Sequence, residues 1–266
     1  MLRCFIILSS ALIGSMALSA QEIERSVVST AGGSVSVGAV RMDQTIGEPA
    51  VTTVLQAGVL LNQGFEQAEP LRLRLGLRAF LQGPYDPNTG RMHDALRAAG
   101  VLPMTEPYTA LGFVQLGGGG ERTNANVLAV SGDHAIVDWV LIELRSGTDN
   151  TVVSATRAAL LCANGDVVDV NGSSSVAFDA PSGSYYICLR HRNHLAVLTQ
   201  APVVLGPMVT GVDLTDGSMP TFGSEAQTIQ AGARLLWSGD VNTDGTIKYT
   251  GAGNDRDVVL VAIGGS

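Results

Sequence analysis

The sequence is poor in lysine, in aromatic side chains and in charge. Of its 16 basic residues only Lys248 is a lysine, and aromatic residues make up 5% of the chain. With a formal net charge of −8 and no basic block, a phosphate-binding surface has little to be built from, which argues against nucleic acid as a partner. The scarcity of aromatic residues argues in the same way against a platform on which bases stack.

Charged residues account for 15% of the 266 residues and hydrophobic residues for 45%. A disordered chain would be richer in charge and poorer in apolar residues, so we expect one or two packed domains. After the first twenty residues, no apolar stretch reaches the roughly 18 residues that a membrane-spanning helix needs. We therefore predict no membrane span in the mature chain.

Residues 1–20 have the pattern of a secretory signal peptide. Arg3 provides the positive start, residues 4–18 form an apolar run, and small residues follow up to Ser19 and Ala20. Cleavage after Ser19 or after Ala20 fits this pattern. An N-terminal membrane anchor is the alternative, but the run is short and interrupted by polar residues. The pattern predicts an exported protein, which is secreted, held at the cell surface or periplasmic.

Export would leave two cysteines in the mature chain, Cys162 and Cys188. An even number of cysteines in an oxidising compartment permits a disulfide. Closing this loop of about 26 residues would stabilise the fold by roughly 3–4 kcal/mol. Two separate buried thiols are the alternative, and the spacing alone does not decide between them.

Residues 21–67 are rich in Gly, Ser, Thr and Val, with short apolar runs separated by turn-forming residues. Such runs predict strands, and no helical period is present. We interpret this stretch as a small β module. The residues around 68–70 resemble a linker between this module and the rest of the chain.

Leucine and arginine alternate over residues 71–81, which predicts a strand with all its leucines on one face. The arginines on the other face would be solvated or would form a stripe that binds anions. A short amphipathic helix is expected over 91–99, ended by Gly100. Residues 136–144 are apolar on both faces of a strand over their first half, which is typical of a central strand buried on two sides.

Turns recur at intervals of roughly ten residues, and Asn164-Gly165 is a strong hairpin signal between two apolar runs. No alternation of helices and strands is present. The sequence therefore predicts an all-β protein, with an antiparallel β-sandwich (Ig-like or related) over residues 71–220.

A calcium-loop pattern lies near the C-terminus, within a predicted calcium-loop segment over 235–266. Oxygen-bearing side chains occur at every second position from Asp240 and are followed by Gly245, which allows a sharp turn. A hard divalent cation prefers six to eight oxygens, and side chains two apart in a tight turn converge on one centre. The candidate Ca²⁺ ligands are Asp240, Asn242, Asp244, the carbonyl of Thr246, and Asp255 or Asp257. Ile247 would anchor the loop.

The second half of the loop departs from the pattern. The twelfth position is Gly251, which offers no carboxylate, so residues 248–253 are interpreted as an insertion before the late aspartates. Asp257 also suits the N-cap of a short final helix over 258–263. The same acidic spacing occurs in ordinary Asx-rich turns that bind no metal, and this alternative stays open.

Four stretches, residues 137–145, 190–195, 239–245 and 248–257, resemble a module of secreted Bacteroidota proteins described as haemagglutinin-like or dockerin-like. The resemblance covers residues 71–266, and the Gly-rich segment before them is similar to N-terminal regions of such exported proteins. It implies a calcium-stabilised β module at the cell surface or outside the cell.

Other residue combinations offer weaker chemistry. His191 and His194 are three residues apart, which on a strand places them on opposite faces and argues against a zinc site. We expect them to lie at a polar strand end. A contact with a sugar or an anion is the alternative. Asp166 and Asp169 have the residue type of a glycosidase pair, but solvation at a hairpin explains them equally well. The four glycines at 117–120 lack the lysine of a phosphate-binding loop and are expected to form a flexible loop.

Two functions follow from these observations. The first is an exported, non-catalytic β-sandwich protein, stabilised by calcium, for adhesion or extracellular protein assembly. Its partner would be a cell-surface or extracellular protein or a glycan. The alternative is a polysaccharide-active enzyme or its carbohydrate-binding accessory module.

Overall fold

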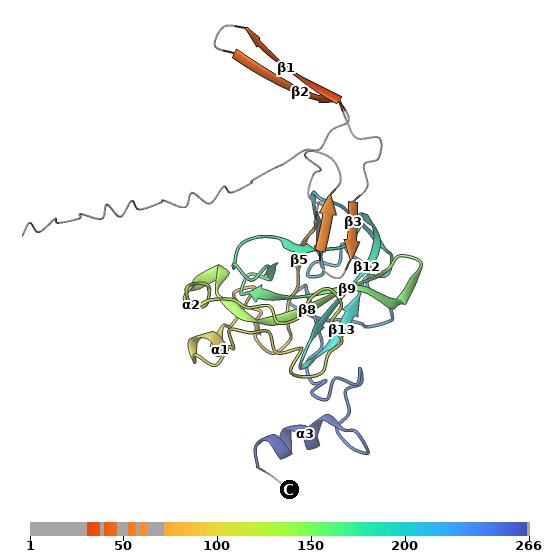
Figure 1. Ribbon diagram of the computed structural model, residues 1–266. Helices are drawn as coiled ribbons and strands as arrows, with labels where there is room; N and C mark the ends of the chain where they lie inside the picture. Colours follow the sequence, from red (N-terminus) through yellow and green to blue (C-terminus); the bar gives the residue numbers. More distant parts are fainter. Residues whose placement is uncertain (1–30, 38–39, 47–52, 57–58, 63–71, 265–266) are drawn as a thin grey trace, which may run out of the picture. The chain divides into compact units, whose positions relative to one another are not determined.

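The structure is a computed structural model that describes residues 31–37, 40–46, 53–56, 59–62 and 72–264 (Figure 1). The chain divides into two compact units, Met1–Glu69 and Pro70–Ser266. The predicted signal peptide, with its cleavage after Ser19 or Ala20, and the predicted linker at 68–70 lie outside the described residues. No helix within the described ranges combines the length and the apolar composition needed to cross a bilayer.

The described part of the first unit consists of two antiparallel hairpins (Figure 1). One pairs β1 (Ala31–Val37) with β2 (Val40–Ile46), and the other pairs β3 (Thr53–Gln56) with β4 (Val59–Asn62). Strands are thus present where the composition of residues 21–67 predicts them. That these residues form one module stays a prediction.

A nine-stranded sheet forms the second unit. Its strands, in spatial order, are β11 (Val176–Phe178), β5 (Leu73–Arg78), β10 (Asp166–Val168), β9 (Asp149–Cys162), β8 (Ile136–Ser146), β12 (Gly183–His191) and β13 (His194–Leu198), with β14 (Val203–Leu205) paired to β12 and β15 (Val209–Asp213) paired to β5. All pairs are antiparallel except β15 with β5. The predicted antiparallel all-β class is confirmed.

Hydrogen bonds connect the extension of β5 with β13, the last strand in this order. Beyond β5, Leu81 forms a parallel bridge with Leu236. On the other side of the same segment, the N–H of Leu195 in β13 donates to the carbonyl of Trp237 at 2.9 Å. Residues 236–238 therefore connect the extension of β5 to β13. Residues from β5, β8, β9, β12 and β13 belong to one buried core. We call the connection through residues 236–238 the seam.

Strand β5 shows why the sequence pattern is informative. Its leucines are buried in the inner core and its arginines point outwards. Arg78 lies 3.2 Å from Asp166 of the neighbouring strand β10, and Arg72, just before β5, lies 2.8 Å from Asp179, just after β11. Phe80 is an exception on the outward face, since it is buried and packs against Tyr85 with ring centroids 4.9 Å apart.

Strand β8 is buried on both faces over Ile136–Leu144, as predicted. Side chains on its inner face, such as Ile142, belong to the core that the strands of the sheet share. Trp139 and Leu141 on its outer face belong to a second apolar cluster, which residues of the preceding long segment such as Tyr108 cover. That segment contains α1 (Ala95–Ala98), α2 (Ala125–Leu128) and a 3₁₀ turn at Gly132–His134.

The helix predicted over 91–99 is shorter than expected. Arg91 and Met92 form strand β7 (Arg91–Met92), which pairs with β6 (Tyr85–Asp86), and only Ala95–Ala98 is helical. Met92 is buried in the inner core, so it packs from a hairpin and not from a helix face. The remaining elements are the hairpin of β16 (Thr228–Gln230) and β17 (Ala233–Leu235), and the C-terminal helix α3 (Asp255–Ala262).

The disulfide between Cys162 and Cys188 is not formed. Both thiols are free and buried. They lie on the two strands that flank β8, where Cys162 is opposite Ile136 and Cys188 is opposite Glu143. Seven residues along a strand span roughly 23 Å, whereas a disulfide needs Cα atoms within about 7 Å. Two separate buried thiols are therefore the correct alternative, and burial raises the pKa of each to about 12.

Candidate cation site in the C-terminal loop

The C-terminal loop, residues 239–255, leaves the sheet beside the turn between β12 and β13. The N–H of Gly239 donates to the carbonyl of Asn193 at 3.0 Å. Gly239 has a φ of 119°, a conformation that favours glycine. The side chain of Ile247 lies so close that a Cβ at Gly239 would be 3.2 Å from it. Ile247 thus contacts the start of the loop, while 44% of its surface stays exposed.

Successive Asx turns shape the first half of the loop. The Oδ2 of Asp240 accepts from the N–H of Gly245 at 3.2 Å. The Oδ1 of Asn242 accepts from the N–H of Asp244 at 3.0 Å, and the Oδ1 of Asp244 accepts from the N–H of Thr246 at 2.8 Å. Gly245 has a φ of 80°, so it makes the sharp turn that the pattern predicts.

Asp255 joins the two limbs of the loop. Its Oδ1 accepts from the N–H of Val241 at 2.8 Å and from that of Asn242 at 3.3 Å, and its Oδ2 accepts from the N–H of Lys248 at 2.8 Å. These backbone hydrogen bonds, led by that of Lys248, lower the pKa of Asp255. Asp255 is therefore an ionised, buried carboxylate that the loop encloses.

Asp257 is not brought into the loop and does not cap the helix. Helix α3 begins at Asp255, and its N-cap is Asn254, whose Oδ1 accepts from the N–H of Asp257 at 2.9 Å. The side chain of Asp257 bonds to Asn254 and Arg256, and these contacts lower its pKa. Its side chain is 55% exposed. Of the two late aspartates, Asp255 is the one that meets the rest of the loop.

One carboxylate oxygen of Asp240 is buried without a hydrogen-bond partner among the described residues. The residue is only 4% exposed, and its Oδ1 has no hydrogen-bond partner among the described residues. Burial, together with the charges of Asp255 and Asp244, raises the pKa of Asp240. A buried anionic oxygen beside two further carboxylates is costly unless a cation or a proton neutralises it.

The loop offers donors that Ca²⁺ prefers, namely carboxylate, amide and carbonyl oxygens. Within the part of the chain that the structure describes, no three His, Cys, Asp or Glu side chains form a group that could hold a metal ion. The amide of Asn242 instead donates to the carbonyl of Gly253 at 2.9 Å and to Asp244 at 3.2 Å. The oxygen donors of the loop and the unpartnered Oδ1 of Asp240 fit a cation. To bind it, Asn242 would give up its hydrogen bonds to Asp244 and to the carbonyl of Gly253.

The spacing of His191 and His194 on a single strand implies that they point to opposite faces. In the structure they do not. They are cross-strand partners in the hairpin of β12 and β13, with Arg192 and Asn193 between them. Opposite residues of a hairpin share a face, so the two rings meet, with centroids 4.6 Å apart. The sequence spacing misleads because the chain turns between the two residues.

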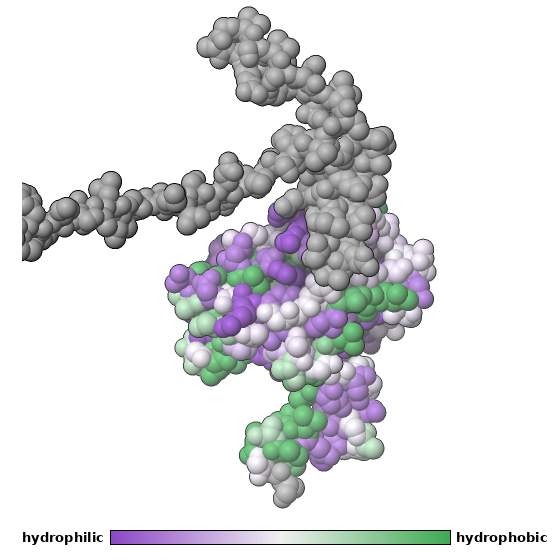
Figure 2. Space-filling view, in the orientation of Figure 1, coloured by the Kyte–Doolittle hydropathy of each residue, from purple (hydrophilic) through white to green (hydrophobic). Residues whose placement is uncertain are grey.

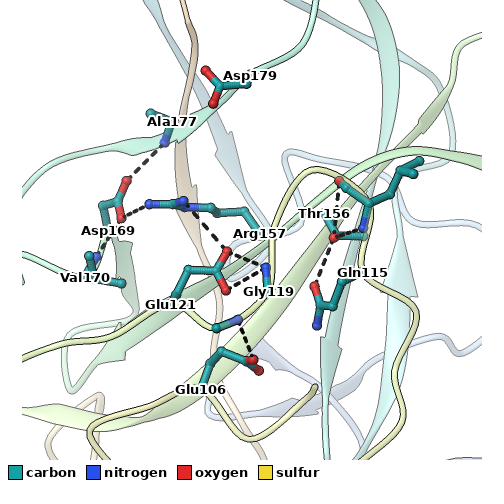
Figure 3. Close-up of polar contacts among 12 residues, drawn as sticks. Glu106, Gln115, Gly119, Glu121, Thr156, Arg157, Asp169, Val170, Ala177 and Asp179 are labelled. Atoms are coloured by element: carbon teal, nitrogen blue, oxygen red, sulfur yellow. Dashed lines mark hydrogen bonds and ion pairs between the residues drawn. The ribbon is translucent and has the colours of Figure 1, made fainter. Parts of the chain in front are cut away.

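The two carboxylates considered for glycoside hydrolysis, Asp166 and Asp169, each lie beside an arginine. Asp169 accepts from Arg157 at 2.9 Å and from the N–H of Val170 at 2.7 Å (Figure 3). Asp166 lies 3.2 Å from Arg78. Each carboxylate has its own arginine, which is the arrangement of a structural ion pair.

The glycine stretch at 117–120 is held in place, contrary to the expected flexible loop. The N–H of Gly119 donates to Glu121, and the N–H of Gly120 donates to Glu106 at 2.9 Å (Figure 3). A Cβ at Gly118 would lie 2.4 Å from the carbonyl oxygen of Thr156, so only glycine fits there. Both glutamates are buried, and their role escapes sequence analysis because they lie outside any motif.

Comparison of the chain with models of protein families, with curated proteins and with solved structures finds no match.

Proposed function

We propose that this chain is an exported, non-catalytic β protein that binds Ca²⁺ through its C-terminal loop and serves adhesion or protein assembly outside the cell. The signal-peptide pattern of residues 1–20 supports export. The single core that the strands of the sheet share, and the contacts of residues 236–238 with both the extension of β5 and β13, support the finer interpretation as a sandwich of the Ig-like or a related type. The resemblance to haemagglutinin-like and dockerin-like modules agrees with both.

The observation that supports calcium most directly is the state of Asp240. A single acceptor bond from Gly245 does not compensate a carboxylate that is buried next to Asp244 and Asp255. An Asx turn without a metal would be expected to expose its carboxylate to water or to pair it. A bound divalent cation would neutralise Asp240 and the neighbouring charges at once.

The ligands on this proposal are Asp240, Asn242, Asp244 and the carbonyl of Thr246, with Asp255 as the late carboxylate. Asp255 keeps acceptor capacity beyond its three backbone bonds, because a carboxylate has about four lone-pair sites. Asp257 is the less favoured alternative, since it is engaged by Asn254 and Arg256. The ion would tie the start of the loop to the start of α3.

The polysaccharide-active enzyme or carbohydrate-binding module has less support. The carboxylates considered for glycoside hydrolysis, Asp166 and Asp169, are each paired with an arginine. We infer a glycan or an extracellular protein as a partner that is bound and not turned over.

A protease that cleaves after lysine but not after arginine provides a sharp test, because Lys248 is the only lysine and lies inside the loop. We expect 10 mM Ca²⁺ to slow cleavage after Lys248 and to raise the melting temperature relative to chelator. Extracellular calcium modules bind at about 10⁻⁴–10⁻³ M, so this concentration should give most of the effect. Mass spectrometry of the fragments identifies the cleavage site.

Asp240→Asn should abolish the protection by calcium. Asp216→Asn is the control for the same chemical change outside the loop, because Asp216 also accepts a hydrogen bond from a backbone N–H, that of Ser218. Comparing Asp255→Asn with Asp257→Asn identifies the late ligand. Identical cleavage rates and melting curves with calcium and with chelator would overturn the calcium proposal.

A further inference from the structure

Two buried imidazoles face each other at the turn between β12 and β13. His191 and His194 are 4% and 7% exposed, and only Arg192 and Asn193 lie between them in the hairpin. Their Nδ1 atoms are 2.9 Å apart. Because the two rings share a face, the spacing of these residues no longer argues against a metal site. We call them the histidine pair.

The Nε2 atom of each ring is held by an acceptor. Nε2 of His194 lies 2.8 Å from the carbonyl oxygen of Gln82, which can only accept, so this nitrogen carries a proton. Nε2 of His191 lies 3.2 Å from Oδ2 of Asp138. Burial opposes the ionisation of Asp138, but its hydrogen bonds and the nearby positive charge outweigh burial and lower its pKa. An ionised carboxylate also needs a donor, so Nε2 of His191 is protonated.

Both Nδ1 atoms are therefore unprotonated when the rings are neutral. The N–H of Asn193 donates to Nδ1 of His191 at 3.2 Å, which agrees with this assignment. Burial lowers the pKa of His194 to about 4, so its ring is uncharged at neutral pH. Two nitrogen lone pairs thus face each other across 2.9 Å. Such a contact is repulsive, and a metal ion that accepts both lone pairs removes the repulsion.

The partners of the two Nε2 atoms are of the kind that metal-binding histidines have. A histidine that binds a metal through one nitrogen almost always donates from the other to a carboxylate, a backbone carbonyl or water, which fixes the ring and its tautomer. Asp138 and the carbonyl of Gln82 provide a carboxylate and a carbonyl. Arg192 holds Asp138 in place by donating to both of its oxygens at 2.7 Å.

The separation of the two nitrogens indicates the kind of ion. Two nitrogens bound to one metal at about 2.0–2.1 Å and at right angles lie about 2.9 Å apart, whereas a tetrahedral arrangement places them about 3.3–3.4 Å apart. The 2.9 Å between the Nδ1 atoms matches the right angle. Right angles are typical of square-planar or tetragonal Cu²⁺ sites, and Cu²⁺ binds nitrogen ligands more tightly than the other first-row divalent ions do.

We propose that the histidine pair binds one Cu²⁺ ion through its two Nδ1 atoms, with the remaining coordination positions open to the adjacent cavity. The pair lines this cavity of about 450 Å³ together with His93 and apolar residues such as Leu96. Nowhere in the described part of the chain do three His, Cys, Asp or Glu side chains form a metal-holding group. Water or a donor atom of a small molecule in the cavity therefore fills the open positions.

The ion has one competitor at the site. It displaces the N–H of Asn193 from Nδ1 of His191, and at 3.2 Å this hydrogen bond is at the long end of the usual range. The hydrogen bonds of both Nε2 atoms are kept, because they involve the opposite nitrogen of each ring.

The histidine pair lies beside the seam. His194 forms a bridge with Ser238, and the side chain of Gln82 accepts from the N–H of Ser238 at 3.0 Å. The carbonyl of Asn193 accepts from the N–H of Gly239, where the C-terminal loop begins. An ion that holds His191 to His194 is therefore expected to stabilise the hairpin to which the seam attaches, and Cu²⁺ should raise the melting temperature.

Electron paramagnetic resonance with one equivalent of Cu²⁺ at neutral pH identifies the ligands. The chain has four histidines, and His93 and His134 are exposed. The double variant His93→Gln/His134→Gln therefore leaves only the pair without altering a buried residue. We expect its spectrum to show splitting from two imidazole nitrogens, with a pattern that changes when the histidines are labelled with ¹⁵N. Splitting from fewer than two histidine nitrogens would overturn the proposal.

Competition titrations with Cu²⁺ measure the contribution of single residues in the same background. Asp138→Asn should weaken binding by about 10–100-fold and keep the splitting from two nitrogens, since Asp138 is a positioning residue. His194→Gln should weaken binding further and leave one nitrogen. Asp240→Asn should change nothing, which separates this site from the proposed calcium loop. Unchanged affinity in His194→Gln would contradict the proposal, and the first experiment stays decisive where a buried substitution unfolds the chain.

Discussion

The sheet and the C-terminal loop with α3 are stabilised in opposite ways. In the sheet, Leu141 and Trp139 are completely buried, and charged side chains lie mostly outside. In the C-terminal segment, Asp240 and Asp255 are buried, while Val261 is 72% exposed. Figure 2 shows apolar residues at the surface around α3. The comparison teaches that the first region depends on apolar burial and the second on carboxylates that accept backbone hydrogen bonds.

The largest effect is expected from a cavity in the sheet. Leu141→Ala removes a fully buried side chain from the outer cluster and should destabilise the domain by about 2–5 kcal/mol. Urea unfolding followed by tryptophan fluorescence measures this loss. Val204→Ala, at a position that is 71% exposed on β14, is the control and should change little. A loss below about 1 kcal/mol for Leu141→Ala would contradict the account of the outer cluster.

A smaller and local effect is expected from Asp255→Asn. The substitution places an amide where three backbone N–H groups need acceptors, so about 1–3 kcal/mol of local stability should be lost. Hydrogen exchange should accelerate at Val241, Asn242 and Lys248 and stay unchanged in β8. Equal acceleration in β8 would show that the C-terminal segment and the sheet unfold as one unit.

The pH dependence of the loop separates its two buried aspartates. The pKa of Asp240 is raised, so in chelator this group favours the native loop when protonated, and the benefit is lost as the pH rises through its folded pKa. The pKa of Asp255 is lowered, so its contribution is lost as the pH falls. Asp240→Asn should remove only the first dependence. Hydrogen exchange at Gly245 from pH 4 to pH 7 measures the difference, and parallel profiles for variant and wild type would refute it.

The smallest effect is expected at the exposed face of α3. Val261→Ala truncates a side chain that is 72% exposed, so stability should change by no more than about 0.5 kcal/mol. The same urea experiment applies. A loss above about 1 kcal/mol would show that this face packs against another surface in solution, and would weaken the contrast between the two regions.

Local patterns predicted several elements well. The alternation over 71–81 identified β5 and its buried leucines, and Asn164-Gly165 forms the turn between β9 and β10, where Gly165 has a φ of 92°. The turn from Asp240 to Gly245 also matches its pattern. These features depend on neighbouring residues only, so the sequence contains the information they need.

Features that depend on distant residues were missed. The first residues of the helix predicted over 91–99 form a hairpin with Tyr85 and Asp86 instead. The N-cap of the C-terminal helix is Asn254 and not Asp257. The spacing of Cys162 and Cys188 left a disulfide and two separate thiols open, and strand β8 separates the two cysteines. In each case a tertiary contact outweighed a local preference.

The sequence by itself determined the strand faces, the main turns and the row of oxygen donors at the C-terminus, because these follow from side-chain spacing along a short backbone. The tertiary structure alone decided that residues 236–238 connect the extension of β5 with β13 and that His191 meets His194. It also decided which late aspartate enters the loop. These contacts join residues far apart in the chain, and their stability depends on burial and charge that arise only when the chain has folded.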